Sequence, residues 1–169
     1  MNGHEIDSTI QKDLRLNFRR VMEESTLSLV EANLPLLALS RALKLPEWEA
    51  KAIAELNLQG VTAEQIQEAK DSAAIMGMLN TYYRFRHFVT DKNPELVESY
   101  KNAGLRMTVF AKPLLGKEKF EMLAFALSVL NGCETCVRSH EATLREAKVD
   151  TAKIHDLARL AAIVKGMAQ

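Results

Sequence analysis

The sequence predicts an all-α fold, with residues 1–169 forming a single domain. Residues of high helix propensity, namely Leu, Ala, Glu, Lys, Met and Gln, are abundant, whereas clusters of β-branched residues are sparse. The chain contains only 7 Gly and 4 Pro, which leaves few turn residues for a fold of many strands. A length of 169 residues and an apolar share of 47% suit one globular domain.

Capping residues and prolines divide the first half of the chain into four predicted helices. Ser25 is expected to cap the second helix, and Pro35 predicts a kink in it or a shifted start. Pro46 suits the first position of the third helix. Thr62 and Gln65 form a capping box that opens a long fourth helix. The expected helices span residues 7–24, 25–45, 46–59 and 62–88.

The second half predicts one short helix, an irregular connection and three longer helices. Pro94 begins the short helix, and residues 104–117 contain two glycines and a proline, which favour an irregular path. Asn131 and Gly132 form a stop signal between two helices, and Asp150 caps the last one. The expected longer helices span residues 117–130, 133–147 and 150–167.

Two segments separated by 88 residues match one another in part. Chance similarity between two amphipathic helices would give the same matches, so an internal repeat and coincidence both stay open. A repeat would indicate two related helical units rather than a solenoid. The matching residues are Val61 with Val149, Ile66 with Ile154, and Ala73-Ala74-Ile75 with Ala161-Ala162-Ile163.

The charge and hydropathy of the chain exclude several classes of protein. Lys plus Arg and Asp plus Glu both number 22, which argues against a nucleic-acid binder or a polybasic membrane-surface protein. The longest apolar stretch, near Met122–Leu130, is far shorter than the roughly 20 residues of a membrane-spanning helix. Residues 1–7 show no basic leader or apolar core of a signal peptide, so we expect a cytoplasmic protein.

The only two cysteines lie close together and share a helix face with a histidine. Cys133, Cys136 and His140 stand at i, i+3 and i+7. The stop signal places Cys133 in the first turn of its helix, where free backbone N–H groups favour an anion. A thiolate is such an anion and is the reactive form of cysteine. His140 is placed to take or return a proton.

Glu121 joins this group only if the chain doubles back after residue 130. In one straight helix, Glu121 would lie about 18 Å along the axis from Cys133 and would be irrelevant. In an antiparallel hairpin, Glu121 and His140 lie about 15 Å and 12 Å from the turn, at similar depth on facing helices. A carboxylate there would fix the tautomer and orientation of the imidazole.

Redox chemistry is the favoured interpretation of the cysteine pair, and two others stay open. The pair could be half of a metal site completed by His140 and Glu121, although structural zinc usually takes two such pairs. It could also be two buried cysteines without a role. The segment from Tyr82 to His87 is either a half-buried helix end, or a wall of the active cleft or a subunit contact.

Several motifs, spread over nearly the whole chain, occur in the order typical of one known family. They are Lys12-Asp13-Leu14-x-Leu16-Asn17, Ala73-Ala74-Ile75-Met76-Gly77-Met78-x-Asn80-x-Tyr82-Tyr83-Arg84-Phe85, Leu105-Arg106-Met107, Phe120-Glu121, Asn131-Gly132-Cys133-x-x-Cys136-x-x-x-His140-Glu141, Leu144-Arg145 and Ala161-Ala162-Ile163-Val164. The sequence thereby resembles the alkyl hydroperoxide reductase D (AhpD) family, a branch of the carboxymuconolactone decarboxylase superfamily.

The resemblance implies a compact helical AhpD-like fold with a helical hairpin that carries the CxxC motif. It also implies a homotrimer, no metal and no other cofactor. By this likeness, peroxide oxidises Cys136 to a sulfenic acid, and Cys133 acts as proton donor and then closes the disulfide. Glu121 and His140 match the family's proton relay. Some relatives carry a His where this chain has Thr135, which leaves the relay one basic group poorer.

The expected function is that of a dihydrolipoamide-dependent thiol peroxidase that reduces organic hydroperoxides and hydrogen peroxide. The resemblance implies a lipoylated acyltransferase and an AhpC-type peroxiredoxin as partners. One alternative is a redox adaptor that passes electrons between these partners with little peroxidase activity of its own. A decarboxylase is disfavoured because such an enzyme needs no cysteine pair, and a metal-bound or helical assembly module also stays open.

Overall fold

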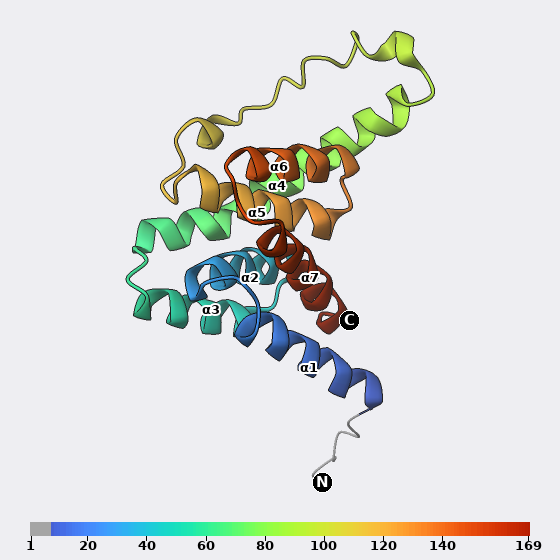
Figure 1. Cartoon of the computed structure of the whole chain (residues 1–169). Helices are drawn as coiled ribbons and strands as arrows, with labels where there is room; N and C mark the ends of the chain where they lie inside the picture. The colour runs from blue at the N-terminus through green and yellow to red at the C-terminus, as the bar shows by residue number, and fades with distance from the viewer. Residues whose placement is uncertain (1–7) are drawn as a thin grey trace.

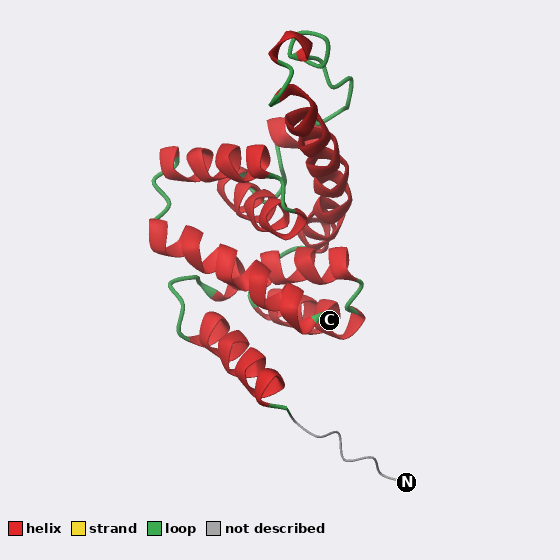
Figure 2. Ribbon diagram, turned by 90° about the vertical axis from the view of Figure 1, so that its right-hand side faces the viewer, coloured by secondary structure: helices red, strands yellow, loops and turns green. Residues whose placement is uncertain are grey.

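The computed structural model describes residues 8–169, and within them it consists of seven α-helices and two short 3-10 helices (Figures 1 and 2). No strand occurs in this range, so the predicted all-α fold is confirmed. The expectation about a signal peptide at residues 1–7 lies outside the described residues. The elements are α1 (Thr9–Glu23), α2 (Leu29–Leu43), α3 (Pro46–Leu58), α4 (Ala63–Thr90), η1 (Pro94–Leu96), η2 (Thr108–Ala111), α5 (Lys117–Asn131), α6 (Glu134–Glu146) and α7 (Thr151–Met167).

Helices α2 and α5 form the centre of the molecule. Residues 32–40 of α2 are all buried, and residues 120–128 of α5 are buried except for Glu121. A helix that is apolar on nearly every side belongs in the interior, because no face of it suits water. Helix α3 packs against α2, α6 packs against α5, and both α4 and α7 pack against the central pair. The exception at Glu121 therefore places one carboxylate within the otherwise buried stretch of α5.

The helices repeat with an offset of 88 residues. Helices α2, α3 and α4 begin at residues 29, 46 and 63, and α5, α6 and α7 begin at 117, 134 and 151. The turns also correspond, since Lys44 and Gly132 are both left-handed, with φ of 58° and 64°. The amide that follows each turn residue donates to the carbonyl of Ser40 or Ser128. This agreement favours an internal repeat over chance similarity.

Most predicted helix boundaries agree with the structure, but the predicted cap of the second helix was wrong. The N-cap of α2 is Ser28, whose Oγ accepts from the Glu31 amide while Glu31 accepts from the Ser28 amide. Ser25 has a serine, not an acid, three residues later, so it cannot form this reciprocal pair. Helix α2 then runs through Pro35 without a break. The capping box at Thr62 is confirmed.

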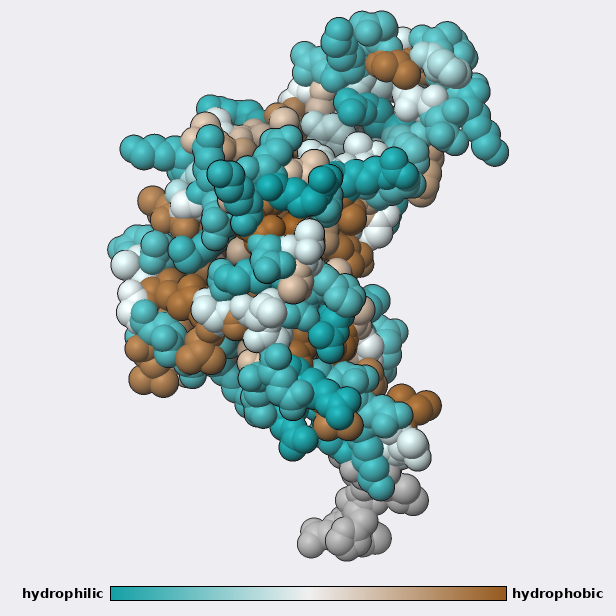
Figure 3. Space-filling view, viewed as in Figure 1, coloured by the Kyte–Doolittle hydropathy of each residue, from teal (hydrophilic) through white to brown (hydrophobic). Residues whose placement is uncertain are grey.

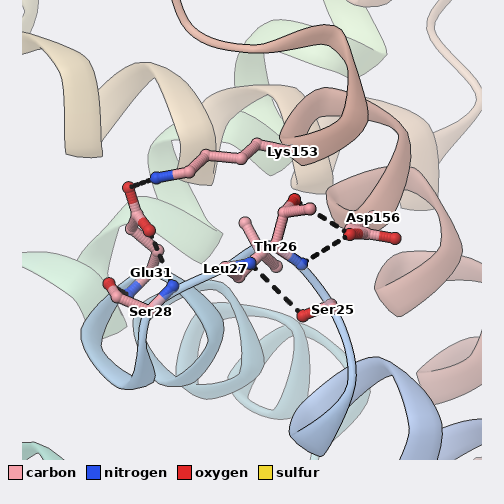
Figure 4. Close-up of polar contacts among 7 residues, drawn as sticks. All are labelled: Ser25, Thr26, Leu27, Ser28, Glu31, Lys153 and Asp156. Carbon is pink, nitrogen blue, oxygen red and sulfur yellow. Dashed lines mark hydrogen bonds and ion pairs between the residues drawn. The ribbon is translucent and has the colours of Figure 1, made fainter.

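The first turn of α2 and the residues just before it are joined to α7 by partly buried polar contacts (Figure 4). Asp156 accepts hydrogen bonds from the Thr26 amide (3.0 Å), the Thr26 hydroxyl (3.1 Å) and Arg159 (2.8 Å). Burial by itself raises the pKa of Asp156, but these hydrogen bonds outweigh it and hold the pKa below its usual value. Lys153 of α7 also pairs with Glu31 at 2.6 Å. These contacts fix α7 against the central helices.

The last turns of α4 extend beyond the body, and residues 91–107 return to it as an arm without regular helix except η1 (Figure 1). On the face seen in Figure 3 this arm is mostly hydrophilic, whereas hydrophobic atoms gather in the body below it. The returning chain brings Met107 and Phe110 against α4 and α6, where they help to line a pocket. None of the helices in residues 8–169 has the length and hydropathy that crossing a bilayer requires.

Candidate active site

The two cysteines lie at the turn of an antiparallel hairpin formed by α5 and α6. Gly132 ends α5 in the left-handed conformation, which glycine adopts without the steric cost that other residues incur. Helix α6 begins at Glu134, so Cys133 is its N-cap and not a first-turn residue as the sequence predicted. The Sγ of Cys133 accepts from the Cys136 amide at 3.4 Å. The predicted reversal of the chain, on which the role of Glu121 depends, is confirmed.

Cys133 and Cys136 form a disulfide, with their Cα atoms 5.3 Å apart. Cys133 is fully buried, whereas Cys136 keeps 6% of its surface exposed and lines a pocket. Cys136 is also the third residue of α6, so it lies in the first turn, where the helix end favours negative charge. Of the two sulfur-bearing residues, Cys136 is therefore the one that a small molecule in the pocket can meet.

Glu121 and His140 face each other across the hairpin, as the antiparallel geometry predicts. The Nδ1 atom of His140 lies 2.6 Å from Oε2 of Glu121, and the side chains are only 14% and 18% exposed. When Nδ1 carries a proton, its N–H donates to the carboxylate. Nε2 is then the ring nitrogen that can take or return a proton. Phe110 stacks on the imidazole with ring centroids 6.1 Å apart. The ring is thus fixed by one hydrogen bond and one aromatic face.

The pocket has a volume of about 450 Å³ and lies between α4, α6 and the chain that returns from the arm. Tyr83 and Arg86 are part of its lining, so the cleft-wall interpretation of segment 82–87 holds for these two residues. Thr135 and His140 also face the pocket. The full lining comprises Met76, Leu79, Tyr83, Arg86, Met107, Phe110, Thr135, Cys136, Ser139 and His140.

A buried polar network holds the hairpin turn against α4. The Asn80 amide donates to the Ser128 hydroxyl at 3.0 Å, and the Asn131 amide donates to the Asn80 carbonyl oxygen at 2.9 Å. Arg84 donates to the Asn131 carbonyl at 2.7 Å. Asn80, Arg84 and Asn131 lie within the motifs of the family resemblance, but no helical pattern predicts this contact between them, and Ser128 within the apolar run of α5 was the usable signal. The network fixes the turn from which Cys133 projects.

Only the second of the two repeated hairpins carries the two cysteines and the histidine. At an offset of 88 residues, Cys133, Cys136 and His140 correspond to Leu45, Trp48 and Ala52, none of which can act as a nucleophile or a base. Trp48 packs edge-on against Phe18 at 4.4 Å, so α1 covers the corresponding position. Within residues 8–169, no group of three or more His, Cys, Asp and Glu side chains is placed to hold a metal ion.

Comparisons with known proteins match the part of the chain that contains the α5–α6 hairpin and identify relatives of nearly the whole chain. Residues 96–169, which include the whole hairpin, match the carboxymuconolactone decarboxylase family. Alkyl hydroperoxide reductase AhpD of Bradyrhizobium sp. (strain ORS 278) is 38% identical over 162 residues, which cover 93% of this chain and 84% of that protein. AhpD of Anaeromyxobacter dehalogenans (strain 2CP-1) is 35% identical, covering 93% and 82%. AhpD of Mycobacterium tuberculosis (strain H37Rv) is 37% identical, covering 94% and 86%.

These likenesses extend over almost the whole chain and over most of each relative. They agree with the resemblance that the motifs around Cys133 and Cys136 indicate in the sequence. The chain therefore belongs to the AhpD family of the carboxymuconolactone decarboxylase superfamily.

Proposed function

We propose that this protein is a thiol peroxidase that reduces hydroperoxides through a dithiol–disulfide cycle. The observation that carries the proposal is the shared pocket of Cys136 and His140, beside a Cys133–Cys136 disulfide and a Glu121–His140 hydrogen bond. A redox pair, a base and a group that orients the base are the parts that such a cycle needs. The relatives' printed name, alkyl hydroperoxide reductase, supports the same activity.

In the first half of the cycle, the Cys136 thiolate attacks the terminal oxygen of the hydroperoxide. The O–O bond breaks, Cys136 becomes a sulfenic acid, and the leaving alkoxide takes a proton to become an alcohol. Glu121 orients His140, and His140 helps to hold Cys136 as the thiolate. Cys133 supplies the proton to the leaving group. Its thiolate then attacks the sulfenic acid and forms the disulfide, and the departing hydroxide takes the proton that His140 holds and leaves as water.

In the second half, an external dithiol reduces the disulfide by two exchange steps, which restores both thiols and oxidises the donor. The family resemblance makes a dihydrolipoyl group on an acyltransferase the proposed donor and a homotrimer the proposed assembly. Thr135 replaces the His of some relatives, so one basic group fewer stands beside Cys136. That replacement favours a second candidate function, a redox adaptor that passes electrons to an AhpC-type peroxiredoxin.

Peroxide consumption with dihydrolipoamide as the only reductant tests the proposal. We expect the wild-type protein to consume tert-butyl hydroperoxide catalytically, and Cys136→Ser to consume none. Cys133→Ser should consume about one equivalent when dihydrolipoamide is left out, since Cys136 still reacts but no internal disulfide forms. Turnover that persists in Cys136→Ser would refute the peroxidase assignment. Turnover in the wild type only after an AhpC-type peroxiredoxin is added would instead support the adaptor.

A further inference from the structure

The pocket contains a cation that has no carboxylate partner among the described residues. Arg86 is half-buried, and its guanidinium lies over the Tyr83 ring, with Cζ 4.8 Å from the ring centroid. Its other contact is a long hydrogen bond of 3.5 Å from Nη1 to the Lys101 carbonyl. By contrast, the exposed Arg138 near the same pocket pairs with Glu134 at 2.7 Å. Arg86 therefore presents a positive charge to the pocket with its anion-binding capacity unused.

The rest of the pocket wall along α4 is largely apolar. Met76, Leu79, Tyr83 and Arg86 stand at i, i+3, i+7 and i+10, so they follow one face of the helix. That face extends for about 15 Å at the rise of an α-helix. It begins with a methionine and a leucine, continues with an aromatic ring and ends with a guanidinium. A molecule that fits this face has an apolar body with an anion at one end.

The sulfur that reacts lies opposite this face. Helix α6 packs against α4, and its first residue, Glu134, pairs with His87 of α4 at 3.5 Å. The start of α6, with Cys136 in its first turn, therefore lies toward the cationic end of the wall. His140 is one turn further along α6 and stacks against Phe110, which also lines the pocket. A molecule bound along α4 would therefore have Cys136 beside the part that lies between its anionic end and its apolar end.

We propose that the preferred substrate is an organic hydroperoxide that carries a carboxylate, with the carboxylate held by Arg86 and the apolar part by Met76, Leu79 and Phe110. The proposal rests on the proposed function and names the substrate class of the same site. The reaction converts the hydroperoxy acid and the two thiols into the hydroxy acid, water and the disulfide. The carboxylate does not change, so it serves only for binding. Hydrogen peroxide would leave both the cation and the apolar wall unused.

The test compares a hydroperoxy acid with its ester. The probes are 5-hydroperoxyeicosatetraenoic acid, whose peroxide lies only a few carbons from its carboxylate, and its methyl ester, each below its critical micelle concentration, with tert-butyl hydroperoxide as a third substrate. Single-turnover oxidation of the reduced protein, followed by stopped-flow, removes the reductant from the measurement. We expect the acid to react at least about tenfold faster than the ester, the selectivity of one charge-assisted hydrogen bond. The arginine variant Arg86→Gln should lose this preference, and Arg86→Lys should restore part of it.

Arg138→Gln is the matched control, because it removes the same charge from an exposed side chain that does not line the pocket. It should keep the preference for the acid. Equal rates for acid and ester in the wild type, or equal loss for both in Arg86→Gln, would overturn the proposal. Oxidation by tert-butyl hydroperoxide would meanwhile show that the proposed peroxidase function survives. If no hydroperoxide oxidises the protein, the proposed function itself fails.

A second measurement does not depend on turnover. The corresponding hydroxy acid, 5-hydroxyeicosatetraenoic acid, cannot oxidise a thiol but keeps the carboxylate and the apolar chain. We expect it to slow alkylation of Cys136 by iodoacetamide in the reduced protein, and its methyl ester to do so at least about tenfold less effectively. Protection should weaken in Arg86→Gln and persist in Arg138→Gln. Equal protection by acid and ester would contradict a role for Arg86 in binding the anion.

Discussion

Replacing Glu121 by Gln should slow the reaction of Cys136 without disturbing the fold. Gln keeps the shape of the side chain and can still accept a hydrogen bond from His140, but it removes the negative charge 2.6 Å from Nδ1. A hydrogen bond to a charged group contributes about 1.5–3 kcal/mol and a neutral one about 0.5–1.5 kcal/mol, so the change costs about 1–1.5 kcal/mol. In the proposed cycle, this energy supports His140 in holding Cys136 as the thiolate. The loss corresponds to a rate that is about five- to thirteenfold lower.

Alkylation of the reduced protein by iodoacetamide at pH 7, with the modified cysteine identified by peptide mass spectrometry, measures the effect. The matched control is Glu118→Gln, which removes the same charge from an exposed position of α5 less than one helical turn earlier. We expect Glu118→Gln to leave the rate of Cys136 alkylation unchanged. Equal rates in the wild type and Glu121→Gln would show that the carboxylate does not act on Cys136 through His140. Equal slowing in both variants would attribute the effect to net charge.

Three further substitutions test the structure around the site. Asp156→Asn should lower the free energy of unfolding by about 1–3 kcal/mol at pH 7, because it weakens the hydrogen bonds from Thr26. Since the pKa of Asp156 lies below its usual value, this contribution is present above about pH 4 and is lost in acid. Urea unfolding at pH 7 and pH 3.5 should therefore show a smaller difference at the lower pH, and a larger one would contradict it. Gly132→Ala should destabilise by about 1 kcal/mol, because its φ of 64° suits glycine; an unchanged thermal midpoint would argue against this turn. Asn80→Leu should leave the Ser128 hydroxyl without its partner and shift the reduction potential of the dithiol, as measured in glutathione redox buffers. An unchanged reduction potential would show that the polar network around Asn80 does not affect the cysteines.

Local signals in the sequence were sufficient to predict most of the helices. Thr62 with Gln65, Pro46 and Asp150 mark helix starts through backbone hydrogen bonds or a fixed φ, which depend on a few adjacent residues. The prediction of Ser25 as the cap was wrong because Ser28 has an acidic residue three positions later and forms the stronger cap. The offset of the repeat was visible in the sequence, but the helix starts and the two left-handed turns were needed to distinguish it from coincidence.

The candidate site was predictable where it depends on helical spacing and on one reversal of the chain. Cys136, His140 and Glu121 follow from these two features, and the hairpin places the last two in contact. The pocket itself was not predictable, since Phe110 and Met107 reach it from an irregular connection whose path has no periodicity. The orientation of Arg86 depends on packing between α4 and the arm, which no pattern in the sequence specifies.

In the proposed cycle, Cys136, and not Cys133, is the sulfur that meets the peroxide. The most direct measurement is peptide mass spectrometry of reduced Cys133→Ser and Cys136→Ser proteins after one equivalent of tert-butyl hydroperoxide in the presence of dimedone, which traps sulfenic acids. Because Cys136 lines the pocket and Cys133 is fully buried, we predict a dimedone adduct on Cys136 in the first variant and little or none on Cys133 in the second. An adduct on Cys133 in Cys136→Ser, together with no adduct on Cys136 in Cys133→Ser, would contradict this assignment.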